Sequence, residues 1–372
     1  MKYYLIAGEA SGDLHGSNLV KEILQLDSDA NIQCWGGDLM LKAGATLVKH
    51  YRELAFMGFV EVMQNLKTIL RNIRFCKADI KRFNPDVVVL IDYPGFNLRI
   101  AQWAKEAGYK TVYYISPQVW AWNAGRVKKM KLFIDQMLVI LPFEQPYFSA
   151  HWDWNVEYVG HPLLQVVETF KSQAPRFSNK PVIALLPGSR KQELKTKLPI
   201  MLEVSRHFPA FDFFVAKAPG LDDEFYEPFI QPYNNVQAVR GQTYELLTQA
   251  TAALVTSGTA TLETALFGVP EVVCYKASTI SYHIVKRMAK IKYISLVNLI
   301  LDKEAVKELI QDELTVGNAV RELELLLHDP AKKEGLKRDY VRLKEILRSD
   351  GDASSRAAYR VCEMARSNYS AL

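Results

Sequence analysis

Residues 3–23 read YYLIAGEASGDLHGSNLVKEI, in which an apolar run breaks into a glycine-containing loop before a helical pattern begins. A strand, a glycine loop and a helix in this order are typical of a parallel α/β sheet. The loop also holds two carboxylates, Glu9 and Asp13, which would repel a phosphate. It is therefore either a nucleotide loop of an unusual kind or not a nucleotide loop at all, and the residues alone leave both open.

The same alternation of strands and helices continues along the chain. A polar stretch with two prolines at 171–181 predicts a linker, and a strand, a glycine loop and a helix then start again at 181–193. We predict an α/β fold of two Rossmann-like domains, residues 1–170 and 181–330, that face each other across a cleft. The helices of residues 331–372 either cross back to the first domain or reach a second subunit of a homodimer. Four continuously apolar runs are typical of buried parallel strands: 86–92, 111–116, 136–141 and the shorter 156–160.

Composition excludes several classes of protein. The 372 residues suit two domains, and 46 basic against 41 acidic residues give a net charge of +5, too mild for a nucleic-acid binder. The four cysteines lie far apart without CxxC spacing, as expected for reduced thiols in the cytoplasm. No signal-peptide pattern opens the chain, and no apolar run reaches the roughly 18 residues of a membrane span. We expect a cytoplasmic protein that is soluble or peripheral on a membrane.

Two glycine loops in the second half favour an anionic ligand. In "LLPGSRKQEL", Gly188, Ser189 and Arg190 lie between a strand and a helix N-terminus, where free N–H groups suit a phosphate. An ordinary turn with a surface arginine explains this stretch equally well. "TSGTATLETALFGVP" is the stronger signal, because small and hydroxyl residues begin a helix and an acidic residue that suits a ribose follows, although helix capping is the alternative. Its candidate residues are Ser257, Gly258, Thr259, Thr261 and Glu263.

The first half holds carboxylates where an acceptor would bind. Asp92 ends the strand at 86–92, where a general base would lie, although a structural cap is an equal alternative. Glu9, Ser11 and Asp13 of "GEASGD" favour a ligand with hydroxyls, meaning a sugar acceptor. Further acceptor-side candidates are Gln118, in a tryptophan-containing loop, and His161, which as a lone histidine is more often structural.

Residues 57–83 predict a long amphipathic helix. An apolar stripe at helical spacing, flanked by basic residues, suits a membrane surface or an acyl-chain channel. On the residues alone, a core helix with a solvated basic side is the favoured interpretation. The apolar stripe is Phe59, Val62, Met63, Leu66, Ile69, Leu70 and Ile73, and the basic stripe is Lys67, Arg71 and Arg74.

Seven motifs in one order carry a family resemblance. "GEASGD", "MGFVEV", "IDYPGFN", "SPQVWAW", "VGHPL", "LPGSR" and "TSGTATLE" resemble the lipid-A-disaccharide synthase family of Gram-negative bacteria, from residue 1 to roughly residue 312. The resemblance implies a type B glycosyltransferase that needs no metal or cofactor. It implies inverting transfer from UDP-2,3-diacylglucosamine to 2,3-diacylglucosamine 1-phosphate, which gives the β-1,6-linked disaccharide 1-phosphate and UDP.

The resemblance also implies roles for individual residues. Asp92 would be the general base on the acceptor 6-hydroxyl, Arg190 would lie next to the donor phosphates, and 257–263 would bind UDP. Asn298 would lie near the nucleotide, although its segment, "LVNLILDKEAVKELIQ" (296–311), departs from the family pattern "LPNLIAGRxVxPELLQ". "GEASGD" then becomes an acceptor-side loop.

Diacylated substrates make membrane association the favoured interpretation of the helix at 57–83, on lipids of the cytoplasmic face of the inner membrane. Two rival functions stay open on the same two-domain plan. One is a UDP-sugar epimerase, and the other is a non-catalytic sugar-nucleotide sensor.

Overall fold

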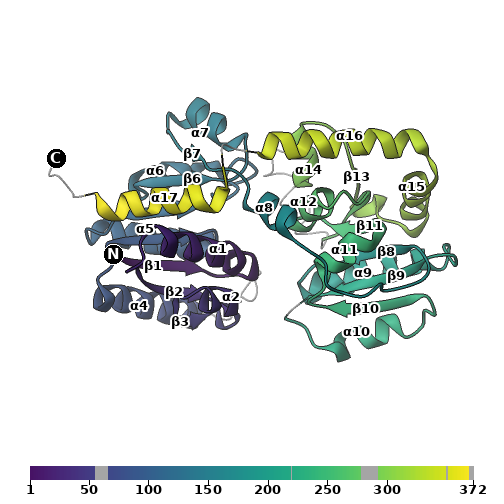
Figure 1. Ribbon diagram of the computed structural model, residues 1–372, viewed down its shortest axis with the longest axis horizontal. Coiled ribbons are helices and arrows are strands. Elements are labelled where there is room, and N and C mark those ends of the chain that lie inside the picture. Colours follow the sequence, from purple (N-terminus) through teal and green to yellow (C-terminus); the bar gives the residue numbers. More distant parts are fainter. Residues whose placement is uncertain (55–65, 219, 278–291, 349–350, 368–372) are drawn as a thin grey trace. The chain divides into compact units, whose positions relative to one another are not determined.

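The computed structural model describes residues 1–54, 66–218, 220–277, 292–348 and 351–367. The chain forms two compact units, of which the first comprises Met1–Pro162 with Arg348–Leu372 and the second comprises Leu163–Leu347. Each unit is a parallel sheet with helices on its faces (Figure 1). The predicted α/β class with two Rossmann-like domains is confirmed.

Within the described residues, the first unit has a seven-stranded sheet in the order β3-β2-β1-β4-β5-β6-β7, with all neighbours parallel. The central strands β1 and β4 are almost entirely buried, which explains their continuously apolar sequences. The strands are β1 (Lys2–Ala7), β2 (Asn31–Gly36), β3 (Thr46–His50), β4 (Val87–Ile91), β5 (Thr111–Tyr114), β6 (Gln136–Val139) and β7 (Glu157–Tyr158).

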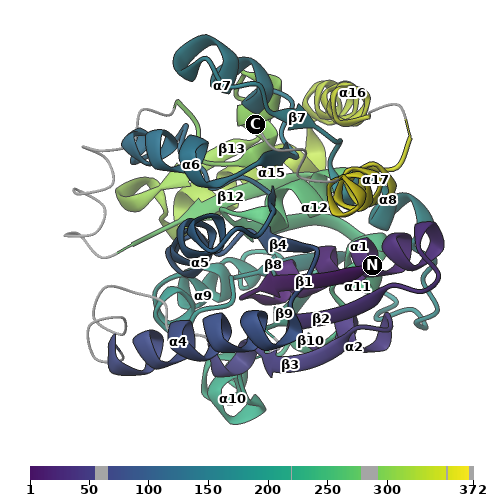
Figure 2. The ribbon, with the colours of Figure 1, turned by 90° about the vertical axis from the view of Figure 1, so that its left-hand side faces the viewer.

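Helices cover both faces of this sheet (Figure 2). One face carries α4 (Leu66–Phe83), α5 (Pro94–Glu106) and α6 (Val127–Phe133), and the other carries α1 (Ala10–Leu26), α2 (Asp38–Lys42) and α17 (Ala353–Arg366). The helix α7 (Glu144–Trp152) precedes the last strand.

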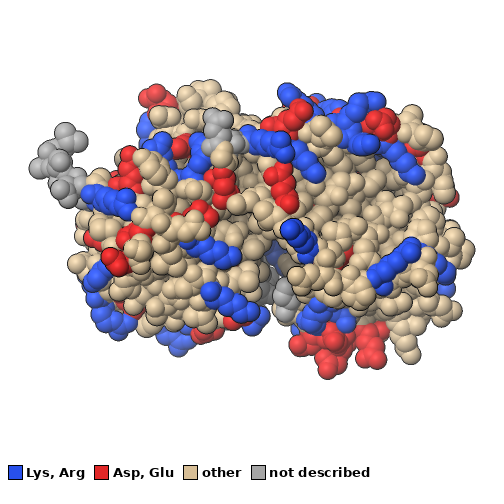
Figure 3. Space-filling model, in the orientation of Figure 1, with Lys and Arg blue, Asp and Glu red and all other residues tan. Residues whose placement is uncertain are grey.

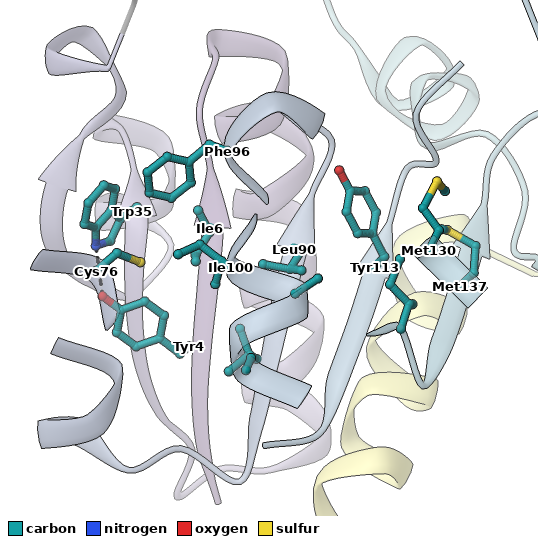
Figure 4. Packing of buried hydrophobic residues seen from close by; sticks show 14 of the residues in the cluster. Tyr4, Ile6, Trp35, Cys76, Leu90, Phe96, Ile100, Tyr113, Met130 and Met137 are labelled. Atoms are coloured by element: carbon teal, nitrogen blue, oxygen red, sulfur yellow. Dashed lines mark hydrogen bonds between the residues drawn. The ribbon is translucent and has the colours of Figure 1, made fainter. Parts of the chain in front are cut away.

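The core between α4, α5 and the sheet contains buried polar aromatic side chains that hydrogen-bond to each other and to Asp79 (Figure 4). The indole Nε1 of Trp35 donates to the Tyr4 hydroxyl over 2.9 Å, and that hydroxyl donates to Asp79 over 2.7 Å. Buried tyrosine and tryptophan need such partners, because an unpaired polar group in the core is costly.

The C-terminal helix α17 returns to the first unit and packs against α1. Its inner face is lined by small residues, among them Ala357 and Ala358, which let the two helices approach closely. Lys110 donates to the carbonyl of Met364 over 3.0 Å, and Arg366 donates to the Leu26 carbonyl over 2.8 Å. Both cations satisfy carbonyls at the C-terminal ends of helices.

Within the described residues, the second unit has a six-stranded parallel sheet in the order β10-β9-β8-β11-β12-β13. Its strands are β8 (Val182–Leu186), β9 (Asp212–Lys217), β10 (Val236–Arg240), β11 (Ala250–Thr256), β12 (Glu271–Tyr275) and β13 (Lys307–Ile310). Its helices are α8 (Pro162–Thr169), α9 (Lys191–Ser205), α10 (Asp223–Ile230), α11 (Thr243–Gln249), α12 (Thr259–Leu266), α14 (Leu296–Leu301), α15 (Val316–His328) and α16 (Pro330–Leu347).

The predicted domain boundaries need correction. We expected the first domain to end at residue 170 and a linker to follow at 171–181, but the units divide at Pro162 and Leu163. The Phe170 ring packs on Tyr244 with centroids 5.4 Å apart, and the Phe177 ring packs on Phe214 at the same spacing. The segment therefore covers the second unit, because its aromatic side chains bury apolar surface there. The end of the second unit likewise moves from residue 330 to Leu347.

Glu271, the first residue of β12, is a buried carboxyl whose replacement should stabilise the fold. It is 1% exposed, and within the described residues neither of its side-chain oxygens has a hydrogen-bond partner. Burial raises the pKa of this carboxyl well above its usual range. Glu271→Met should raise the free energy of unfolding at pH 7 by about 1–3 kcal/mol, measured by urea denaturation.

The pH dependence of this gain tests its cause. A carboxyl with a raised folded-state pKa destabilises the fold only above the pKa of about 4.3 that glutamate has in the unfolded chain. The advantage of the methionine variant should therefore shrink as pH falls toward 4. An equal gain at pH 4 and pH 7 would mean that packing, and not ionisation, causes it.

Candidate functional site

The carboxyl ends of the central strands hold the chemistry of the first unit. The strand order reverses between β1 and β4, and ligands of parallel α/β sheets bind outside the carboxyl ends at such a point. Glu9 lies two residues after the end of β1, and Asp92 directly follows β4. The two carboxylates that the sequence singled out are thus brought to the same edge of the sheet.

Asp92 has a fixed and strained backbone. Its φ is 45° and that of Tyr93 is 50°, so two consecutive residues other than glycine adopt the left-handed conformation. The Asp92 carbonyl accepts hydrogen bonds from the Tyr113 hydroxyl at 2.6 Å and from the Asn97 amide at 2.7 Å. Its N–H donates to the Tyr114 carbonyl over 3.0 Å. These three contacts fix the backbone of Asp92.

The environment of Asp92 prepares its carboxyl for proton transfer. Burial and, to a lesser degree, the nearby Glu9 carboxylate together raise the pKa of Asp92 to about 7, against a hydrogen bond from the Tyr93 backbone that lowers it. A general base works best when its pKa lies near the operating pH. Asp92 is therefore suited to accept a proton at neutral pH.

Gly8 lets the two acidic loops approach each other. A Cβ at this position would lie 2.3 Å from the ring of Tyr93, so any larger residue would displace that ring. The Tyr93 hydroxyl donates to the Leu54 carbonyl over 3.2 Å, which fixes the ring from its other end. The glycine at the start of "GEASGD" thus serves protein packing and not a phosphate.

Glu144 is a further carboxyl in the first unit that the sequence analysis missed, and it is buried. One of its oxygens accepts from the Leu141 N–H at 2.9 Å, and the other accepts from the Trp120 indole at 3.2 Å. Burial, with a small contribution from the charge of Asp92, raises the pKa of Glu144 to about 8 against the hydrogen bonds that lower it. Glu144 follows the predicted strand 136–141 closely, as Asp92 follows its own strand, so the same rule could have found it.

Two acceptor-side predictions need correction. The Asp13 carboxylate accepts from the N–H groups of Gly37 at 2.7 Å, Leu39 at 3.1 Å and Met40 at 3.1 Å, so it caps the start of α2. It is 3% exposed and its oxygens are occupied by the fold.

His161 is also 3% exposed, and burial, with a smaller effect from His15, lowers its pKa to about 3. It is therefore neutral at physiological pH and enclosed by protein, which argues against acceptor contact. Gln118 is exposed after β5, and Ser11 is partly exposed in the first turn of α1, so both remain candidates.

The second unit places its two glycine loops at the equivalent point of its sheet, where the order reverses between β8 and β11. Gly188 has a φ of 108°, and the exposed Ser189 and Arg190 lead into α9. Gly258 has a φ of 140° and precedes α12, and the described residues beyond its chain neighbours place no atom within 4 Å of where its Cβ would lie. Both loops therefore combine a glycine of positive φ with a helix N-terminus. This arrangement is typical of phosphate-binding loops.

Around the second loop, some side chains are engaged in bonds within the protein and others are exposed to a ligand. The Ser257 hydroxyl donates to the Ile294 carbonyl over 2.8 Å, which joins the loop to the segment before α14. Thr259 is exposed, and one oxygen of the partly exposed Glu263 accepts from the Tyr244 hydroxyl at 2.8 Å. Burial raises the pKa of Glu263. Thr261 needs correction, because it is fully buried and its hydroxyl donates to the Gly258 carbonyl at 2.8 Å.

Asn298 also needs correction as a nucleotide contact. Its amide nitrogen donates to the Val306 carbonyl at 2.8 Å and to Glu308 at 2.9 Å, and its amide oxygen accepts from the N–H groups of Ala305 and Val306. These four bonds use the full capacity of the amide. Asn298 is fully buried, and its hydrogen bonds stabilise the segment whose Ile294 carbonyl accepts from Ser257.

The predicted amphipathic helix lies partly outside the described residues, as do Phe59, Val62, Met63 and the side chain of Leu66. In α4 the predicted apolar stripe divides, because Ile69 and Ile73 pack on the core while Leu70 is 45% exposed. Lys67, Arg71 and Arg74 are exposed beside Leu70. Ile69 and Ile73 are thus core residues and not part of a membrane-facing stripe.

Solved structures share this fold. A UDP-GlcNAc 2-epimerase from Neisseria meningitidis, bound to UDP-GlcNAc, is 13% identical with a TM-score of 0.68 and matches 98% of this chain and 100% of its own. The glycotransferase of kitacinnamycin is 15% identical with a TM-score of 0.65 and matches 98% of this chain and 99% of its own. The architecture is that of type B glycosyltransferases and the epimerases that share it.

Sequence comparison separates these alternatives. The family model described as lipid-A-disaccharide synthetase matches residues 3–359. The lipid-A-disaccharide synthase of Geobacter metallireducens is 38% identical, with 97% of this chain and 96% of that protein aligned. That of Syntrophus aciditrophicus is also 38% identical, with 95% of each aligned. The chain belongs to the lipid-A-disaccharide synthase family, and it is a glycosyltransferase. The match reaches beyond residue 312, where the motifs ended, and includes the start of α17.

Proposed function

We propose that this chain transfers 2,3-diacylglucosamine from UDP-2,3-diacylglucosamine to 2,3-diacylglucosamine 1-phosphate, with Asp92 as the general base. The observation that carries the role of Asp92 is its partly buried, strained position at the point where the first sheet reverses its strand order. The first unit then supplies the acceptor side, with Glu9, Ser11 and Gln118 as candidate contacts. The second unit supplies the donor side through the loops that begin α9 and α12.

The transfer is a single displacement at the anomeric carbon of the donor. Asp92 accepts the proton of the acceptor 6-hydroxyl as the oxygen attacks, and the bond from the anomeric carbon to the phosphate oxygen breaks with its electron pair going to UDP. Arg190 and the helix N-termini of the second unit stabilise the charge that develops on the diphosphate. Attack opposite the leaving group inverts the configuration, which gives the β-1,6 linkage.

The raised pKa of Asp92 predicts a pH dependence. The base must be ionised, so kcat/KM should fall about tenfold per pH unit below pH 7. Glu9→Gln removes a negative charge that raises the Asp92 pKa, so the acid limb of the profile should move to lower pH. The measurement is the profile of kcat/KM for the acceptor between pH 5 and pH 9. An acid limb that stays in place in the Glu9 variant would contradict this coupling.

Acceptor dependence separates the proposal from its rivals. A transferase releases UDP in proportion to acceptor consumed, whereas an epimerase changes the UDP-sugar without any acceptor and a sensor changes neither. UDP release should therefore require 2,3-diacylglucosamine 1-phosphate. Conversion of the UDP-sugar in its absence would favour the epimerase.

We also propose that the first unit lies on the cytoplasmic face of the inner membrane through α4. Among the described helices, none is both long and apolar enough to cross a bilayer. Leu70 and Phe75 of α4 are each 45% exposed, and Lys67, Arg71 and Arg74 are exposed around them. Lys and Arg side chains also gather at the lower left of Figure 3, where Figure 1 places α4. Apolar side chains framed by cations suit an anionic lipid surface.

Replacing the exposed apolar residues of α4 should weaken binding to vesicles. Leu70→Ser with Phe75→Ser should reduce co-sedimentation with vesicles containing anionic lipid severalfold, because buried apolar area drives such binding. Leu325→Ser, at a similarly exposed position of α15 in the second unit, is the matched control. Equal pelleting of all three proteins would remove α4 from the membrane contact.

A further inference from the structure

A buried lysine lies beneath the donor loops of the second unit. Lys197 of α9 is 2% exposed, which is rare for lysine because desolvation of an ammonium group is costly. Its Nζ donates to the Thr256 hydroxyl and, over 3.3 Å, to the carboxylate of Glu193. The Thr256 hydroxyl in turn contacts the Cys274 carbonyl at 3.4 Å. Among the described residues, the cation thus donates to one carboxylate and one hydroxyl.

The same group of residues reaches both glycine loops. Thr256 ends β11 directly before Ser257 and Gly258. A Cβ on Gly188 would lie 3.0 Å from Glu193, 3.2 Å from Thr256 and 3.8 Å from the Lys197 nitrogen, so the Gly188 backbone passes directly over them. Lys197 of α9 therefore contacts the end of β11, directly beneath the turn at Gly188.

Glu193 is shared between two cations. One of its oxygens contacts the Arg190 guanidinium at 3.3 Å, and the other contacts Lys197 at 3.3 Å. Arg190 is 59% exposed at the start of α9, where a diphosphate would bind, whereas Lys197 is enclosed. The three charges sum to +1, and without Lys197 they would sum to zero, with the carboxylate left to compete with an incoming phosphate for Arg190.

We propose that Lys197 is a positioning residue for the donor diphosphate, which holds and neutralises Glu193 so that Arg190 can turn to the phosphates. This inference rests on the proposed placement of the donor in the second unit. Lys197 itself does not touch the donor, because Gly188, Glu193 and Thr256 enclose it. Its effect on binding therefore passes through Glu193.

The test is a set of variants whose affinity for UDP is measured by isothermal titration calorimetry. Lys197→Met should raise the Kd about tenfold, because an uncompensated carboxylate then opposes the diphosphate and retains Arg190. Lys195→Met removes the same charge from an exposed position of α9 and should change the Kd by less than about twofold.

The double variant distinguishes positioning from a direct or merely structural role. Once Glu193→Gln removes the carboxylate, Lys197 has no charge left to neutralise, so Lys197→Met with Glu193→Gln should bind UDP within about threefold of the wild type. A double variant as weak as Lys197→Met would overturn the inference, and so would a Kd for Lys197→Met that equals the wild-type value.

Two further outcomes distinguish a failure of this inference from misfolding of a variant and from a failure of the proposed function. If Lys197→Met does not fold, Glu193→Gln alone tests the inference, because it should not weaken UDP binding and a tenfold loss would overturn it. A wild-type protein that binds no UDP would reject the donor assignment itself. Normal wild-type binding with unresponsive variants would reject only the role of Lys197.

Discussion

Replacing Asp92 with asparagine should lower the rate of disaccharide formation by about 10²–10⁴-fold, the usual contribution of a general base. Asparagine keeps the shape of the side chain but cannot accept the proton of the acceptor hydroxyl. The fold should tolerate the change, because the contacts that hold this residue are made by its backbone with Tyr113, Asn97 and Tyr114. The measurement is turnover with both lipid substrates at saturating concentration.

Binding of UDP should be unchanged in the same variant, because the proposed donor loops belong to the other unit. Asp86→Asn is the matched control, since Asp86 is an exposed carboxylate just before the same strand, at its opposite end. Near-normal turnover in Asp92→Asn would exclude the general-base role. Loss of UDP binding together with turnover would mean that the substitution disturbs more than one proton transfer.

Placing a charge on the buried face of α17 should cause the largest loss of stability. Ala358 is fully buried on α17, which packs against α1, β4 and β5, and an aspartate there would leave an unpaired charge in this packed region. Ala358→Asp should lower the free energy of unfolding of the first unit by about 3–5 kcal/mol, measured by urea denaturation. The variant should also lose activity, because α1 begins at the Glu9 loop.

The neighbouring position gives the control for this prediction. Tyr359 is 57% exposed on the same helix, so Tyr359→Asp introduces the same charge into water and should change stability by less than about 1 kcal/mol. Equal destabilisation by the two variants would show that the charge acts on the helix itself and not on its packing against α1.

The central strands were predictable because they are buried on both faces. The run at 87–91 is continuously apolar, and Asp92 after it could be placed at the carboxyl end of a parallel sheet without further information. The strand β2 was missed because the polar Asn31 and Gln33 interrupt its apolar residues. The edge strand β3 was missed because it has no fully buried residue and its sequence mixes polar with apolar side chains. Edge strands lack the apolar pattern on which such predictions depend.

The roles of individual polar residues were less predictable, because they depend on partners far along the chain. Asp13 resembles a ligand contact until α2 supplies three N–H groups, and Asn298 resembles one until residues 305–308 saturate its amide. Lys197 reads as one of several lysines on α9 until its burial is known. Glu144 was within reach of the rule that found Asp92.

The most direct test of the account is the complete reaction. The purified protein is incubated with UDP-2,3-diacylglucosamine and 2,3-diacylglucosamine 1-phosphate without added metal, and the lipids are identified by mass spectrometry while UDP is quantified. The account predicts a disaccharide 1-phosphate and an equal amount of UDP. UDP without disaccharide, or two unchanged substrates, would contradict it.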